Sequence, residues 1–148
     1  MNAIANHLTA DHKHCDDLFI DAENCVDSAA WVQAAAVFAQ FRDAIENHFS
    51  MEEKVLFPAF ENATGNSNGP TGVMRSEHQQ IRGIISALSD AIARCDKNAY
   101  LGHSESLNIM LQQHNFKEEN ILYPMTDRVL SAQQHDLIGE MNRLASVA

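Results

Sequence analysis

A seven-residue segment of this chain occurs twice, and the two copies constrain its fold more than any other feature. Residues 52–58 (Glu-Glu-Lys-Val-Leu-Phe-Pro) return 66 positions later as residues 118–124 (Glu-Glu-Asn-Ile-Leu-Tyr-Pro). An offset that holds across both halves of a chain indicates two copies of one structural unit. The same offset relates three further pairs: His12 with His78, His48 with His114, and Asp11 with Glu77.

The spacing within each copy places a histidine and a glutamate together. Residues four apart on an α-helix differ by only about 40° of rotation and one turn of rise. His48 and Glu52 therefore point the same way, and so do their counterparts His114 and Glu118. Glu53 and Glu119, five residues after these histidines, turn by about 140°, so we expect them to face solvent or a neighbouring helix.

The remaining histidines do not follow the repeat, and we expect surface or capping roles for them. His14 is the chief rival of His12, because two residues apart on a helix means opposite faces and only one can point inward. The register of the repeat and the preceding Asp11 both favour His12. The histidines without a histidine at the offset are His7, His14, His103 and His135.

Apolar residues recur at spacings of three and four, and no segment shows sustained alternation, so the sequence predicts an all-α protein. We expect an antiparallel four-helix bundle with a short extra C-terminal helix. Ser131 and Gln134 predict a capping box at the start of that last helix. One domain, 1–148, would contain two repeats of about 9–62 and 71–128. The predicted main helices cover 9–27, 28–58, 71–95 and 99–124.

Two copies of a two-histidine, one-glutamate set predict a centre with two metal ions. Neutral imidazole and carboxylate without thiolate suit iron, with manganese or zinc as alternatives. Bridging glutamates would leave positions for an oxo or hydroxo bridge (an Fe–O–Fe centre) and for an outside ligand such as dioxygen, nitric oxide, peroxide or water. The alternative is a buried polar layer without metal, which costs several kcal/mol per unpaired charge. The predicted ligands are His12, His48, Glu52, His78, His114 and Glu118.

Several neighbouring residues allow two interpretations. Asp11 and Glu77 would accept a hydrogen bond from the outer nitrogen of a ligand histidine, or would only help a helix to begin. Phe49 and Phe116 would shield the metals, although aromatic residues at such positions more often belong to the core. Cys15 is expected to be a small buried residue rather than a redox thiol.

Charge and cysteine content bear on partners and location. The net charge of −10 disfavours nucleic acid and anionic membrane surfaces as partners. No signal peptide precedes Lys13, and the three cysteines form no disulfide framework, so we expect a cytoplasmic protein. The sequence points to no protein partner.

Together these positions resemble the hemerythrin-like (HHE cation-binding) family, whose pattern is an early histidine followed by HxxxE and a further acid, repeated once. The resemblance covers nearly the whole chain. It implies a non-haem di-iron centre in a four-helix bundle, with bridging carboxylates and an open site for small oxidising molecules.

The resemblance also implies which role is disfavoured. Oxygen-carrying hemerythrins have a fifth histidine from an HxxxH pair on the third helix, whereas here Arg82 follows His78 by four residues and Met74 precedes it by four. They also have an aspartate five residues after the last histidine, and here the acid best placed is Glu118.

Two functional hypotheses remain. The first is a di-iron protein that binds or reduces a small oxidant in the response to oxidative or nitrosative stress. The second is an iron-handling or oxygen- or iron-sensing module without turnover. A ferritin-like oxidase would need Glu-x-x-His pairs, which the sequence lacks.

Overall fold

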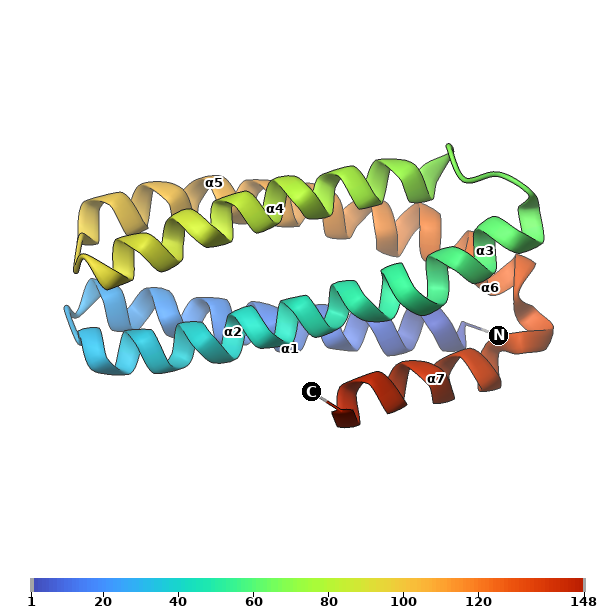
Figure 1. The fold of residues 1–148 in the computed structure, drawn as a ribbon, viewed down its shortest axis with the longest axis horizontal. Helices are drawn as coiled ribbons and strands as arrows, with labels where there is room; N and C mark the ends of the chain where they lie inside the picture. The colour runs from blue at the N-terminus through green and yellow to red at the C-terminus, as the bar shows by residue number, and fades with distance from the viewer. Residues whose placement is uncertain (1, 148) are drawn as a thin grey trace.

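The computed structural model describes residues 2–147, which are helical and contain no strand. Four long helices run antiparallel to one another as a bundle (Figure 1). This confirms the predicted all-α four-helix architecture. Within residues 2–147, no helix is long and apolar enough to cross a membrane. The long helices are α1 (Ala3–Asp27), α2 (Trp31–Met51), α4 (Pro70–Ala93) and α5 (Lys97–Lys117).

Two wide helical turns replace the breaks that the prolines predict. The π-helical segments η1 (Glu52–Leu56) and η2 (Glu118–Leu122) join α2 to α3 (Phe57–Thr64) and α5 to α6 (Tyr123–Val129). In each, an N–H bonds the carbonyl five residues earlier. A proline ring would clash with a carbonyl of a regular α-helix, and the wider turn moves that carbonyl aside. Both helices therefore continue past their prolines.

The N-terminus of α1 is held by a residue from the far end of the chain. The Asp127 carboxylate accepts hydrogen bonds from the backbone N–H groups of Ile4 (2.9 Å) and Ala5 (3.1 Å). An acid at this end satisfies free N–H groups and complements the helix dipole. Helix α1 consequently begins six residues earlier than the sequence predicts.

The C-terminal helix is present but begins differently. A 3₁₀ turn, η3 (Ser131–Gln133), precedes α7 (Gln134–Val147), which folds back along the bundle and packs against α1, α2 and η1 (Figure 1). The predicted capping box was wrong, because the Gln134 amide donates to the carboxylate of Asp127 at 2.8 Å instead. The same aspartate thus ties α7 to α1.

The apolar core is divided into two clusters with a polar layer between them. Along α1, Leu8 belongs to one cluster and Cys15 to the other, and His12 lies between them. Along α4, Met74 and Ile81 flank His78 in the same way. The predicted ligands therefore lie at one level of the bundle, shielded by hydrocarbon on both sides.

Candidate metal centre

Six buried side chains meet in the polar layer. They come from all four long helices and from the first residues of the two π segments. None is more than 5% exposed. The structure brings together every residue of the predicted ligand set: His12, His48, Glu52, His78, His114 and Glu118.

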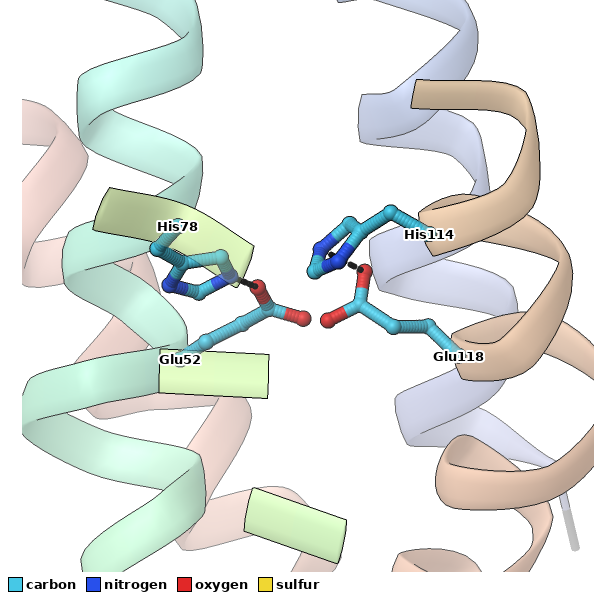
Figure 2. A group of neighbouring side chains, drawn as sticks. All are labelled: Glu52, His78, His114 and Glu118. Carbon is cyan, nitrogen blue, oxygen red and sulfur yellow. Dashed lines mark ion pairs between the residues drawn. The ribbon is translucent and has the colours of Figure 1, made fainter. Parts of the chain in front are cut away.

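The ligand atoms fall into two groups that share Glu118. In each group the ligand atoms lie within 4.8 Å of one another, a spacing that fits one metal ion. Figure 2 shows the group that includes Glu52, with its two carboxylates pointing toward one another. We name the groups the α1–α2 cluster (His12, His48 and Glu118) and the α4–α5 cluster (Glu52, His78, His114 and Glu118).

Each imidazole in the layer is held by an acid on its outer side. The Nδ1 atom of every histidine in the layer lies within hydrogen-bond distance of a carboxylate, which leaves Nε2 facing inward. Acids in this position fix the tautomer and orientation of metal-binding histidines and raise their basicity. The pairs are His12 with Glu119 (2.6 Å), His48 with Asp11 (2.8 Å), His78 with Glu53 (2.6 Å) and His114 with Glu77 (2.8 Å).

The sequence identified two of these four acids. Asp11 and Glu77 each lie within hydrogen-bond distance of a histidine on the adjacent helix, the contact expected of an acid that orients an imidazole. Glu53 and Glu119 were expected to face solvent or a neighbouring helix, and the second option is correct. The sequence did not reveal that the neighbour would again be a ligand histidine.

Glu52 and Glu118 form a close pair of buried carboxyl groups. Burial, followed by the charge of Glu118, raises the pKa of Glu52 well above its usual range. Burial would also raise the pKa of Glu118, but contacts with Glu52, His114 and His12 lower it well below its usual range. Without metal the pair therefore holds one proton, on Glu52, because two like charges in contact do not both ionise.

The pKa values of the histidines in this layer shift in different directions. Burial would lower the pKa of His12 and of His114, yet contact with Glu118 raises each to about 9. Burial lowers the pKa of His78 to about 4 despite its bond to Glu53. Without metal, protons on His12 and His114 supply positive charge to the layer. Because imidazoles that bind a metal must be neutral, binding of a metal ion would release these protons.

The donor atoms fit a metal cation. Four buried side-chain atoms in the layer have no hydrogen-bond partner within the described chain. An unpartnered buried polar atom costs about 1–3 kcal/mol, and a cation bound by these lone pairs removes that cost. The atoms are Glu52 Oε1, His78 Nε2, His114 Nε2 and Glu118 Oε2.

Tyr123 belongs to the layer, and the sequence did not predict it. Its buried hydroxyl donates to Glu52 Oε2 at 2.7 Å and lies 3.0 Å from Glu118 Oε1. A residue five positions after Glu118 would point away in a regular helix, but the π turn needs an extra residue and brings it inward. The available signal was the aromatic-proline pair at the end of both repeated segments.

The other histidines lie outside the layer, as expected. His14, His103 and His135 are exposed and His7 is half-buried. His12 rather than His14 is therefore the residue of α1 that points inward.

The two phenylalanines differ from one another. The ring of Phe49 is buried and stacks on that of His78 with 3.8 Å between centroids, so it both packs in the core and shields the layer. Phe116 is 63% exposed, so neither interpretation of it was correct. Cys15 is buried, and burial raises the pKa of its thiol, in keeping with a structural residue.

Comparison with known proteins supports a metal centre. The sequence model of the hemerythrin HHE cation binding domain matches residues 3–126. An iron-sulfur cluster repair protein, YtfE of Edwardsiella ictaluri (strain 93-146), is 30% identical over 93 residues, which cover 56% of this chain and 42% of that protein. The chain thus spans less than half the length of this relative. No solved structure matches the chain significantly.

Proposed function

This chain belongs to the hemerythrin HHE cation-binding family, and from this premise we propose that it holds two iron ions and binds or reduces a small oxidant. Dioxygen, nitric oxide and peroxide are the candidate oxidants. The role we propose is in the response to oxidative or nitrosative stress, which the name of the iron-sulfur cluster repair relative supports.

The observation that carries this proposal is the set of inward-facing Nε2 atoms around two buried carboxyl groups. Four outer acids hold the imidazoles in place before any ion arrives, and Glu118 belongs to both clusters. Imidazole and carboxylate ligands suit iron, with manganese and zinc as the other metals compatible with this set. Bound iron would supply redox electrons and open coordination positions to the oxidant.

The chain's own residues limit what reaches the centre. Hydrocarbon clusters lie above and below the layer, and Phe49 covers one face of His78. Large reductants and organic molecules are therefore kept from the ligand atoms, whereas small neutral molecules need little space. This selectivity fits a diatomic or peroxide ligand better than an organic substrate.

Titration of dioxygen, nitric oxide or hydrogen peroxide into the reduced, iron-loaded protein tests the proposal. Fast spectral change with repeated consumption of the oxidant supports reduction, and spectral change at a fixed stoichiometry supports binding or sensing. His12→Ala should weaken the response strongly, and His14→Ala, a matched change on the exposed face of α1, should leave it intact. An iron-loaded protein that ignores all three oxidants would contradict the proposal.

A further inference from the structure

The hydroxyl of Tyr123 touches four inward-facing atoms of the centre at once. Its oxygen lies 2.7 Å from Glu52 Oε2, 3.0 Å from Glu118 Oε1, 3.2 Å from His12 Nε2 and 3.3 Å from His48 Nε2. A phenol has one hydrogen to donate and two lone pairs to accept with. Hydrogen bonding alone therefore does not account for four such contacts.

These distances match the spacing of ligands around one ion. With metal–ligand bonds of about 2.1 Å, neighbouring ligands of an octahedral ion lie about 3 Å apart. The four distances from the Tyr123 oxygen are close to this value. Because two of the four partners are His12 and His48, the oxygen lies where a further ligand of the α1–α2 cluster would lie.

The other half of the chain shows that packing does not require this oxygen. At the 66-residue offset the counterpart of Tyr123 is Phe57, which is fully buried. The Phe57 ring stacks on that of His78 with 5.8 Å between centroids. An aromatic ring thus fits the equivalent position without a hydroxyl. The phenol oxygen lies beside both histidines of the α1–α2 cluster, whereas the ring on His78 in the other cluster carries no oxygen.

We propose that Tyr123 is a ligand of the iron ion in the α1–α2 cluster, an inference that rests on the proposed di-iron function. On binding of ferric iron the O–H bond breaks, the proton leaves to solvent, and an oxygen lone pair forms the bond to iron, with no electron transferred. Tyr123 fills a coordination position at this ion and none at the other. The outside oxidant is thereby directed to the α4–α5 cluster.

Absorption and resonance Raman spectra of the iron-loaded, oxidised chain test this assignment. We expect a visible phenolate-to-iron charge-transfer band and enhanced tyrosine ring vibrations, both lost in Tyr123→Phe. The chain has two tyrosines, so Tyr100→Phe, which alters a tyrosine equally buried in α5, is the matched control and should retain both signals. Iron content, measured separately, should stay at about two ions per chain in both variants.

The outcomes separate the two proposals. Two iron ions per chain with no tyrosine vibrations in the unaltered protein, or an unchanged spectrum in Tyr123→Phe, would overturn the assignment of Tyr123 while leaving the di-iron function standing. Less than one iron ion per chain would overturn both. Because the first comparison uses the unaltered chain, it does not depend on how well the variant folds.

Discussion

The two clusters are built from matching residues, but the charges around them differ. Beside the α4–α5 cluster, the acids that orient the histidines are themselves bound by cations. Arg82 donates to Glu53 at 3.0 Å, and Lys117 donates to Glu77. The Arg82 guanidinium also lies 5.2 Å from the centroid of the Phe49 ring. This side of the bundle is therefore bridged by charge and covered by an aromatic ring.

Beside the α1–α2 cluster the outer acids, Asp11 and Glu119, have no lysine or arginine ion partner within residues 2–147. The 66-residue offset places Asp16 where the other side has Arg82. A groove of about 390 Å³ opens here between α1 and α5, and Asp16 and Glu119 belong to its lining. The comparison shows that residues one layer outside the candidate ligands decide whether the outer acids of a side are paired with cations. Grooves of about 320 Å³ and 370 Å³ also open on the other side, beside Glu77 and Arg82.

The largest expected effect separates the clusters by metal content. Glu118 belongs to both clusters and Glu52 to one, so Glu118→Ala should lose nearly all bound iron, whereas Glu52→Ala should retain about one ion per chain. Elemental analysis of the purified variants measures this, and charge-transfer absorption should weaken in both. Equal metal loss in the two variants would show that Glu52 serves both ions.

The next effect concerns His12 and His78, counterparts in the repeat with opposite pKa shifts. In metal-free protein, NMR titration should show His12 losing its proton near pH 9 and His78 near pH 4. Because the folded pKa of His12 is raised, its stabilisation is complete below about pH 6.5 and disappears as the pH rises through about 9. Because the folded pKa of His78 is lowered, the free energy of unfolding decreases as the pH falls from about 6.5 to about 4.

Chemical denaturation should record both changes in the free energy of unfolding, each on the order of 3 kcal/mol. His12→Gln should reduce the alkaline loss of stability by about half and leave the acid loss unchanged, because His114 also has a pKa raised to about 9. If both imidazoles titrated near pH 6.5, the predicted difference between the pKa values of His12 and His78 would be wrong.

A smaller effect should follow from removing the ionic bridge beside the α4–α5 cluster. Arg82 pairs with Glu46 as well as Glu53, so Arg82→Met should lower the free energy of unfolding by about 1–2 kcal/mol in low salt. Arg42→Met is the control, because Arg42 is exposed and its ion partner Asp43 lies 4.0 Å away. Equal effects of the two substitutions would mean that the bridge contributes nothing measurable.

The smallest effect should come from rebuilding that bridge beside the α1–α2 cluster. Gln112 is the counterpart of Glu46, so Asp16→Arg with Gln112→Glu recreates the charge pattern found beside the α4–α5 cluster. We expect a gain of about 0.5 kcal/mol in the free energy of unfolding, measured by urea denaturation. Asp17→Arg, a neighbouring exposed position outside the groove, should give no gain. A double variant less stable than either single change would contradict the equivalence of the two sides.

Helical periodicity and the repeat predicted the bundle and the six residues that converge in its polar layer. The helix ends were less accurate because tertiary contacts set them. Asp127 holds the start of α1 across 123 positions of sequence, and the π segments carry two helices past Pro58 and Pro124. Local sequence patterns reveal neither the Asp127 contact nor the π segments.

The same turns explain what was missed in the site. Regular α-helical geometry turns Glu119 and Tyr123 away from the ligands, whereas a five-residue turn and an adjacent helix bring both to the layer. The repeated glutamate pair and the aromatic-proline pair were present in the sequence as signals. These signals could be interpreted only with the two π-helical segments, which helix propensity does not reveal.

Metal content of the unaltered protein tests the central claim most directly. Protein purified from iron-supplied cells should contain about two iron ions per chain, because two clusters of imidazole and carboxylate ligands are available. Less than one bound metal ion per chain, of any kind, would contradict this account of the polar layer.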